Sequence, residues 1–233
     1  MRLHDIAPAI LIFAALALPD PAAAKYEGFR RIGVISAVGD AFTVQKIGIT
    51  VFGNERNQFA IEPWKIDDYV VGRIRAALAG RFDVRAVNVP KAAILASGGS
   101  ASKIAEAIRQ ASPQGLDAYI VVTGWTSAFG TTNQSVGGLG IVDASGGLVG
   151  TNVTVFTLYA VTVIDGRQFT SLGAAVPPSP GFFVTVHGPS RAVDKTWLPA
   201  ALDANANPKL KSAVMELLAQ SLPATLQKLE LTK

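Results

Sequence analysis

The sequence predicts a single α/β domain with a mixed β-sheet, and three observations support this class. Segments rich in β-branched residues alternate with segments of helical periodicity, an order that packs helices against a sheet. About half of the 233 residues are hydrophobic (49%), which is enough for a sizeable core. The chain has no cysteine, which excludes a disulfide scaffold and a thiolate metal site. The expected order of elements is β-β-α-β-α-β-β-β-α.

Residues 1–24 differ in composition from the rest of the chain and are expected to form a signal peptide. Arg2 precedes an apolar run from Ile6 to Leu18, and three alanines end the segment at Ala24. A charged start, a short apolar run and small residues before the cleavage site are typical of secretory signals. The run is too short to cross a bilayer core. We expect cleavage after Ala24, no lipid anchor because no cysteine can accept one, and a periplasmic or secreted domain over 25–233.

The first part of this domain is expected to hold two strands and a helix. Residues 31–38 and 43–52 are rich in β-branched residues that partly alternate with polar ones, and Gly39-Asp40 between them suits a turn. Residues 62–79 are expected to be helical. A proline stands in the first turn of this segment, apolar residues recur at helical spacing, and Gly80 follows it.

A third strand, a short helix and a central strand are expected next. Residues 82–87 alternate as a strand does, and Pro90 ends the segment. After a Ser-Gly loop, Ser100 or Ser102 can cap a short helix. Residues 118–125 are apolar on both faces, as expected of a strand that helices cover on both sides.

The last part is expected to form a long hairpin and a C-terminal helix. Residues 151–164 alternate without interruption, which predicts one strand roughly 46 Å long. Asp165-Gly166 suits a two-residue turn, and residues 167–176 return as the next strand. A helix begins at Asn207-Pro208, and Pro223 is expected to kink or break it.

These elements resemble one known family. Its pattern is a helix followed by L-x-x-x-F-x-V, here Leu78, Phe82 and Val84, then G-L-D-A-Y-I-V-V-T-G at 115–124 and V-I-D-G-R-Q-F at 163–169. The chain thus resembles the TolB amino-terminal-domain-like proteins of the bacterial envelope, which include CsgG-like secretion channels and LpoB-like activators. The resemblance implies an envelope protein that acts by contact or assembly. It provides no catalytic residues, and this chain lacks the acylated cysteine of the lipoprotein members.

Charge is unevenly distributed along the chain. Residues 110–190 carry four charged side chains in 81 positions, whereas residues 25–109 carry 21 in 85. The basic excess is small, with a net charge of +4. Its densest cluster, Arg73 to Arg85, mixes a helix end with a strand instead of forming one basic face. We therefore expect no nucleic-acid partner.

Few residues are available for catalysis. His187 is the one histidine after the signal segment, and no G-x-S-x-G or phosphate-binding glycine motif occurs. Asp67 and Asp68 are adjacent on a helix, so their carboxylates diverge and cannot share a substrate. We expect no catalytic residues, no metal and no cofactor.

Two segments are candidates for contact with a partner. The Gly-rich segment 130–150 is either a flexible surface loop or a β-arm that pairs with another subunit or lies against a membrane. The Pro-rich segment 177–207 carries aromatic residues that either meet a partner or fix the loop to the domain. If the arm mediates self-association, deletion of residues 131–150 should leave a folded monomer. The candidate surface residues are Val136, Leu139, Ile141, Leu148, Phe182, Phe183 and Trp197.

Three functions remain open at this stage. The first is a non-enzymatic interaction or assembly component of the bacterial envelope, with an envelope protein or a second copy as its partner. The second is a periplasmic protein that binds a small ligand in a cleft beside Trp125 and the Gly-rich segment. The third is a hydrolase with an unrecognised site.

Overall fold

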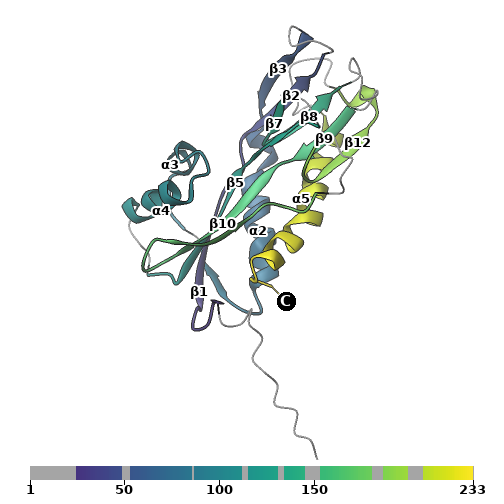
Figure 1. Cartoon of the computed structure of the whole chain (residues 1–233). Coiled ribbons are helices and arrows are strands. Elements are labelled where there is room, and N and C mark those ends of the chain that lie inside the picture. Colours follow the sequence, from purple (N-terminus) through teal and green to yellow (C-terminus); the bar gives the residue numbers. More distant parts are fainter. Residues whose placement is uncertain are drawn as a thin grey trace, which may run out of the picture.

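The computed structural model describes residues 25–48, 53–85, 87–111, 115–130, 134–144, 153–179, 186–198 and 207–232. These residues form one domain of mixed α and β structure, with two five-stranded sheets, a two-stranded ribbon and four α-helices (Figure 1). The strands are β1 (Arg31–Ala37), β2 (Ala41–Lys46), β3 (Glu55–Ala60), β4 (Asp83–Arg85), β5 (Ala118–Gly124), β6 (Thr126–Ala128), β7 (Ser135–Gly137), β8 (Leu139–Asp143), β9 (Val153–Thr157), β10 (Tyr159–Asp165), β11 (Ser171–Ala175) and β12 (Ser190–Val193). The helices are α2 (Ile66–Leu78), α3 (Lys91–Ala96), α4 (Ala101–Gln110) and α5 (Pro208–Lys228), with short 3-10 turns η2 (Glu62–Trp64) and η3 (Lys195–Trp197).

The predicted mixed α/β class is confirmed, but the strands divide between two sheets. The first sheet has the order β11-β10-β5-β1-β4, in which β1 runs parallel to both β4 and β5. The second sheet has the order β12-β9-β8-β2-β3, in which β2 runs parallel to β8 and the other pairs are antiparallel. Strand β5 is buried over six of its seven residues, as its apolar composition predicts.

The single long strand expected over 151–164 is wrong: the chain changes sheets within it. Strand β9 ends at Thr157 in the second sheet, and β10 begins at Tyr159 in the first. Leu158 between them donates its N–H to the Gly138 carbonyl (2.7 Å), and its own carbonyl accepts from Trp125 N (3.0 Å). The Leu158 backbone is thereby bonded outside both ladders.

Strand β11 also begins later than the sequence predicts, at Ser171 instead of Arg167. Five residues, 166–170, connect β10 to β11 in place of a two-residue turn. The Asp165 carboxylate accepts hydrogen bonds from the backbone N–H groups of Arg167 and Gln168, which fixes the wider turn.

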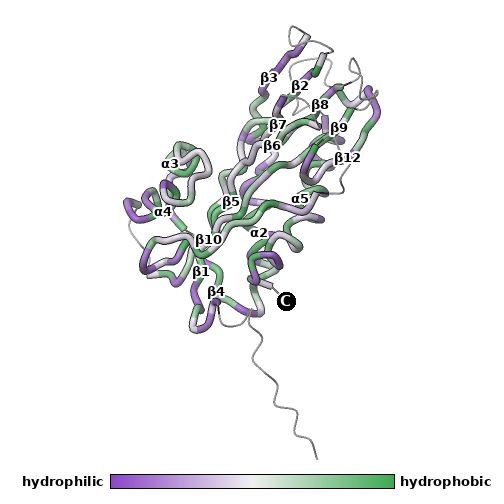
Figure 2. The backbone as a smooth tube through the Cα atoms, viewed as in Figure 1, coloured by the Kyte–Doolittle hydropathy of each residue, from purple (hydrophilic) through white to green (hydrophobic). Residues whose placement is uncertain are grey.

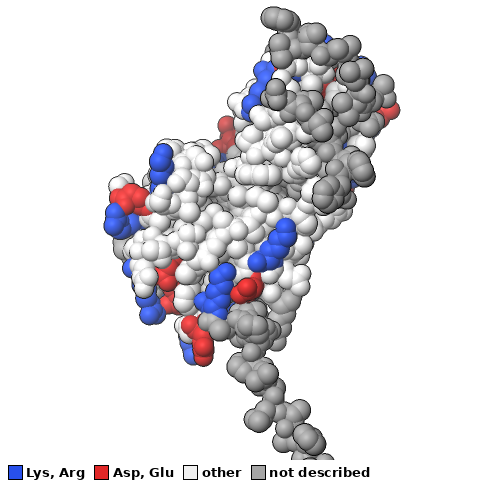
Figure 3. All heavy atoms as spheres, in the orientation of Figure 1, with Lys and Arg blue, Asp and Glu red and all other residues white. Residues whose placement is uncertain are grey.

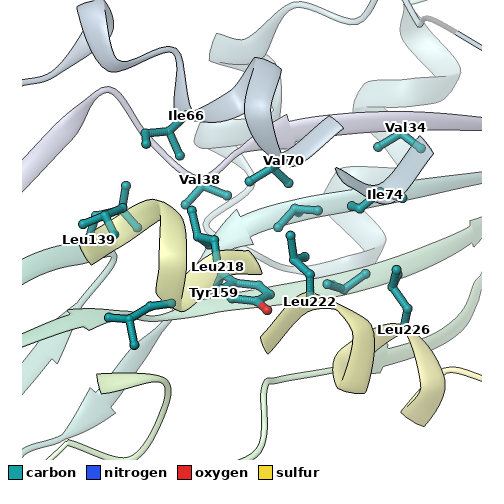
Figure 4. Packing of buried hydrophobic residues seen from close by; sticks show 14 of the residues in the cluster. Val34, Val38, Ile66, Val70, Ile74, Leu139, Tyr159, Leu218, Leu222 and Leu226 are labelled. Atoms are coloured by element: carbon teal, nitrogen blue, oxygen red, sulfur yellow. The ribbon is translucent and has the colours of Figure 1, made fainter. Parts of the chain in front are cut away.

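Helices α2 and α5 lie on the same side of the molecule and pack against each other and against both sheets (Figure 1). The main core lies beneath them and draws side chains from both sheets, so the two sheets belong to one domain. Figure 4 shows side chains of this core, among them Val34 of β1, Leu139 of β8 and Leu222 of α5. Helices α3 and α4 carry the apolar residues of a second cluster on the opposite face of the first sheet.

Two helices differ from their expected form. Lys65 has a left-handed backbone (φ 52°), which separates the turn η2 from α2, so α2 begins at Ile66 instead of Glu62. Helix α5 begins at Pro208 as expected, with the Asn207 side chain accepting hydrogen bonds from two backbone N–H groups. However, α5 continues through Pro223 to Lys228. Pro223 is exposed, so the carbonyl that it leaves unbonded one turn earlier can be solvated.

Core burial accounts for much of the low charge of residues 110–190. Of their four charged residues, Asp117 and Asp143 are each only 7% exposed. Strands β5, β8, β9 and β10 are almost entirely buried. Figure 2 shows the strands through the middle of the molecule mostly in the hydrophobic colour, and Figure 3 shows few charged side chains on the middle of the same face.

A candidate binding cleft where the two sheets meet

The chain passes between the two sheets beside the carboxyl ends of β1 and β5. From β1 the chain continues through β2, β3 and α2 to β4, which pairs with the edge of β1 away from β5. From β5 it continues through β6, β7, β8 and β9 to β10, which pairs with the edge of β5 away from β1. The connections thus leave the neighbouring strands β1 and β5 in opposite directions. In α/β sheets such a switch point opens a crevice at the carboxyl ends of the strands, where ligands bind.

A polar cluster holds this junction together. The Asp67 carboxylate of α2 accepts hydrogen bonds from Ser36 Oγ (2.7 Å) and from Val38 N (3.0 Å), and it also pairs with Lys91 Nζ. Lys91 Nζ bonds Asp40 Oδ1 at 2.6 Å. Desolvation lowers the pKa of Lys91, but the hydrogen bonds to Asp40 and Asp67 outweigh it and leave that pKa raised. The lysine is therefore a cation that ties α3 to α2 and to the turn after β1.

A cleft of about 230 Å³ opens next to this turn. Its lining residues come from the turn after β1, from β2 and β3, and from the segments around Gly124 and Gly138. Side chains on one face of β2 and β3 form part of the wall, because Thr43 pairs with Gln58 and the next position on that face of β3 is Arg56. The lining residues are Val38, Gly39, Ala41, Thr43, Arg56, Gln58, Gly124, Trp125, Thr126, Gly137, Gly138 and Leu139.

Glycine forms part of the wall for conformational reasons. Gly39 and Gly138 have positive φ angles of 135° and 66°, which side-chain-bearing residues rarely adopt. The backbone therefore turns sharply on two sides of the cleft without a side chain to fill it. The wall is peptide backbone there, a surface that offers hydrogen-bonding groups to a polar ligand.

Of the described residues that line the cleft, Arg56 is the one that carries a charge. Arg56 is exposed, and no carboxylate belongs to the lining residues. Within the described part of the chain, no acidic side chain pairs with Arg56. Beside Arg56 on the same strand face, Gln45 is 5% exposed, and its Oε1 finds no hydrogen-bond donor among the described residues. Gln45 does not line the cleft, so the charged group that the cleft offers is the unpaired guanidinium of Arg56.

Trp125 lies where the second functional alternative places it. It belongs to the cleft wall and also packs, half-buried, against the apolar cluster that contains Phe129, Val136 and Phe156. The cleft and the residue named from the sequence therefore coincide.

The surface residues expected in the Gly-rich segment are core residues instead. Val136 and Ile141 are completely buried and Leu139 is 1% exposed; they lie in β7 and β8. The expected arm is thus, in its described part, a ribbon strand and a central strand of the second sheet. Deletion of residues 131–150 would remove the strand that joins β2 to β9 and cannot leave the fold intact. Uncharged composition here reflects burial.

The remaining surface candidates are less informative. Leu148, Phe182 and Phe183 lie outside the described residues. Trp197 is half-buried and packs on the main core, and Arg191 and Lys209 lie over its ring at 5.7 and 6.0 Å. For Trp197 the structure supports the alternative in which an aromatic residue fixes the loop to the domain.

Neither His187 nor Asp68 lines the cleft. His187 lies next to the bridge between Phe129 and Val186. Asp68 is exposed, whereas its neighbour Asp67 is bonded into the junction. Among the described residues, no group of three potential metal ligands occurs, and no helix is long and apolar enough to span a membrane.

Sequence reasoning missed Asp40, Lys91 and Arg56. Asp40 belongs to the predicted turn after the first strand, and Lys91 directly follows the proline that ends the preceding segment. Their ion pairs join positions 24 and 51 residues apart, so no local motif marks them. Arg56 lies in β3, a polar strand whose E-R-N-Q-F-A sequence lacks the alternation typical of a strand.

Comparisons with known proteins give structural similarity only. No family model and no curated protein matches the sequence. A DUF330 protein of Xanthomonas campestris is similar over 87% of this chain and 85% of its own, with 8% identity and a TM-score of 0.39. A lipoprotein of Neisseria meningitidis is similar over 82% of this chain and 99% of its own, with 13% identity and a TM-score of 0.28. The PelC dodecamer of Paraburkholderia phytofirmans is similar over 82% of this chain and 89% of its own, with 13% identity and a TM-score of 0.26.

These similar structures are all bacterial proteins, and one is described as a lipoprotein. None is described as a TolB, CsgG or LpoB protein, so that resemblance stays a prediction from the sequence. With every TM-score below 0.5, the function proposed next rests on this chain's own residues.

Proposed function

We propose that this protein is a non-enzymatic binding component of the bacterial envelope and that the cleft between the sheets is its ligand site. The observation that carries the proposal is the position and charge of the cleft. It lies at the switch point between β1 and β5, and Arg56 in its wall has no acidic partner among the described residues. The signal-like segment 1–24 supports export.

The ligand class follows from the lining residues. Arg56 recognises carboxylates through two parallel hydrogen bonds, and Thr43 and Gln58 add neutral polar groups beside it. A volume of about 230 Å³ corresponds to roughly eight water molecules, below the 300 Å³ or more of drug-sized sites. A small organic carboxylate, either free or at the end of a peptide, fits both properties.

The polar cluster next to the cleft supports binding more than catalysis. Both oxygens of Asp67 are engaged, by Ser36 and Val38 on one side and by Lys91 on the other. Both oxygens are thus used in contacts within the protein. Their effect is to fix the turn at Val38 and Gly39, which is one wall of the cleft.

A thermal-shift experiment tests the proposal. The probes are acetate, benzoate and phenylacetate, with benzyl alcohol as the uncharged comparison. A ligand at a hundredfold excess over its dissociation constant stabilises by about 2.7 kcal/mol, or about 5–10 °C for a domain of this size. Such a shift should occur with a carboxylate, disappear in Arg56→Gln, and persist in Arg75→Gln, which removes an exposed arginine of α2. Equal shifts in the two variants, or no shift with any probe, would contradict the proposal.

A second function, an assembly component, is favoured by one edge strand. The edges of the two large sheets are β11, β4, β12 and β3, and of these only β11 lacks a charged residue. Charged residues on edge strands prevent pairing with other chains, so β11 is the least protected edge. We propose that a second copy pairs along β11.

Light scattering of Ala174→Lys tests this second function, because Ala174 is exposed on β11. The substitution should convert an oligomer into a monomer, whereas Asn57→Lys on the edge strand β3 should not. A wild-type monomer, or an unchanged oligomer in Ala174→Lys, would contradict it.

A further inference from the structure

A second hollow lies at the opposite end of the first sheet, beside the amino ends of β1 and β4. It has a volume of about 410 Å³ and is lined by Arg30, Arg31, Arg81 and Asp83. In Figure 3 several charged side chains lie toward this end of the molecule, whereas the middle is nearly free of them. Three arginines and one aspartate therefore line one concave surface.

The single carboxylate does not neutralise the three arginines. Asp83 is already engaged by Arg85, through Nε at 2.8 Å and Nη2 at 2.7 Å. Arg30 and Arg31 have no ion pair among the described residues. Like charges that share a hollow repel each other, and an anion bound between them removes the repulsion.

Arg81 is held in place before any ligand binds. Its Nη1 donates to the Glu230 carbonyl at 2.6 Å, and its guanidinium lies over the rings of Phe82 (4.9 Å) and Tyr26 (5.9 Å). The Glu230 carboxylate also lies near the Tyr26 ring, because its charge and that of Arg81 both affect the pKa of Tyr26. A guanidinium fixed in this way loses little freedom on binding an anion.

The fold does not need the side chains of Arg30 and Arg31. Their backbone N–H groups both donate to Asp117 Oδ2, each at 2.9 Å, and these bonds anchor the start of β1. Both side chains are exposed, and no hydrogen bond of either is found among the described residues. Two arginines at adjacent positions whose side chains do no visible structural work point to a ligand.

We propose that this hollow binds the phosphate group of a phosphate ester. Arginine is well matched to phosphate, which accepts parallel N–H bonds from one or more guanidinium groups. The hollow holds roughly fourteen water volumes, which leaves room for an organic substituent on the phosphate. Two sources share this chemistry: a phospholipid headgroup at a membrane surface and a soluble phosphate ester.

The experiment uses Arg30→Gln/Arg31→Gln and a control, Arg73→Gln/Arg75→Gln, which removes two exposed arginines of α2 and the same charge. Binding of glycerol 3-phosphate is measured by calorimetry, and binding to vesicles of phosphatidylcholine with and without phosphatidylglycerol by flotation. Circular dichroism establishes that both variants are folded.

The Arg30/Arg31 variant should bind at least tenfold more weakly than the wild type, and the control should bind within about twofold. Binding of glycerol 3-phosphate would identify a soluble ester, and binding of phosphatidylglycerol vesicles alone would identify a headgroup. Equal losses in both variants would show general attraction to anions and overturn the proposal, as would the absence of binding to either probe. This outcome is independent of the Arg56 experiment, because the two hollows share no residue.

Discussion

Replacing Asp67 by alanine should destabilise the protein severely, because this carboxylate joins three elements. It accepts from Ser36 Oγ and Val38 N, and it pairs with Lys91. Ser36 Oγ and Val38 N would lose a charged acceptor in mostly buried surroundings, and each such loss lowers the free energy of unfolding by about 1–3 kcal/mol. The partly exposed ion pair adds about 1 kcal/mol or less. The expected loss is therefore about 3–5 kcal/mol.

Urea denaturation measures this loss directly. With a slope of about 2–3 kcal/mol per molar urea, the midpoint should fall by about 1–2 M. Asp68→Ala is the matched control, because Asp68 is the adjacent acidic residue in the same turn of α2 and is exposed. Its stability should change by less than about 0.5 kcal/mol. Similar midpoints for the two variants would refute the assignment of Asp67 to the junction.

Two further predictions concern pH and glycine. The N–H groups of Arg31 and Arg30 and the Arg167 guanidinium lower the pKa of Asp117 from 3.8 despite its burial. The resulting stabilisation is present above pH 3.8 and is lost as the pH falls below it. Asp117→Asn should therefore lower the urea midpoint at pH 7, and the midpoint of this variant should fall less steeply below pH 4. An unchanged dependence of the midpoint on acid pH would contradict this. A Cβ on Gly140 would lie 2.5 Å from the Thr43 carbonyl oxygen, so Gly140→Ala should destabilise, whereas a Cβ on Gly72 in α2 meets nothing and Gly72→Ala should stabilise by about 1 kcal/mol. Thermal melts compare the two, and a stable Gly140→Ala would show that β2 and β8 lie farther apart.

Elements defined by local chemistry could be predicted from the sequence. The burial of β5 follows from its unbroken apolar composition, and the start of α5 follows from Asn207 followed by proline. The break at Leu158 could not be predicted, because the alternation of apolar residues continues through it. Hydrogen bonds to Trp125 and Gly138 decide it, and those residues are 33 and 20 positions away.

The candidate site shows the same division. The sequence places a cleft beside Trp125 and the Gly-rich segment, and Trp125, Gly137 and Gly138 do line one. Arg56 and Lys91 could not be assigned to this region, because the sequence does not reveal the elements that carry them. Strand β3 lacks the alternation of a strand, and helix α3 has only six residues. The low charge of residues 110–190 did not indicate a contact surface. Val136 and Ile141 are apolar because they lie in the core.

An NMR titration of the ¹⁵N-labelled protein with benzoate tests whether a small carboxylate binds in the cleft beside Arg56. Four glycines line the cleft, and glycine amide signals are well separated. We expect shifts at Gly39, Gly124, Gly137 and Gly138 that saturate and that vanish in Arg56→Gln. Shifts that occur elsewhere on the molecule, or that persist unchanged in Arg56→Gln, would contradict this expectation.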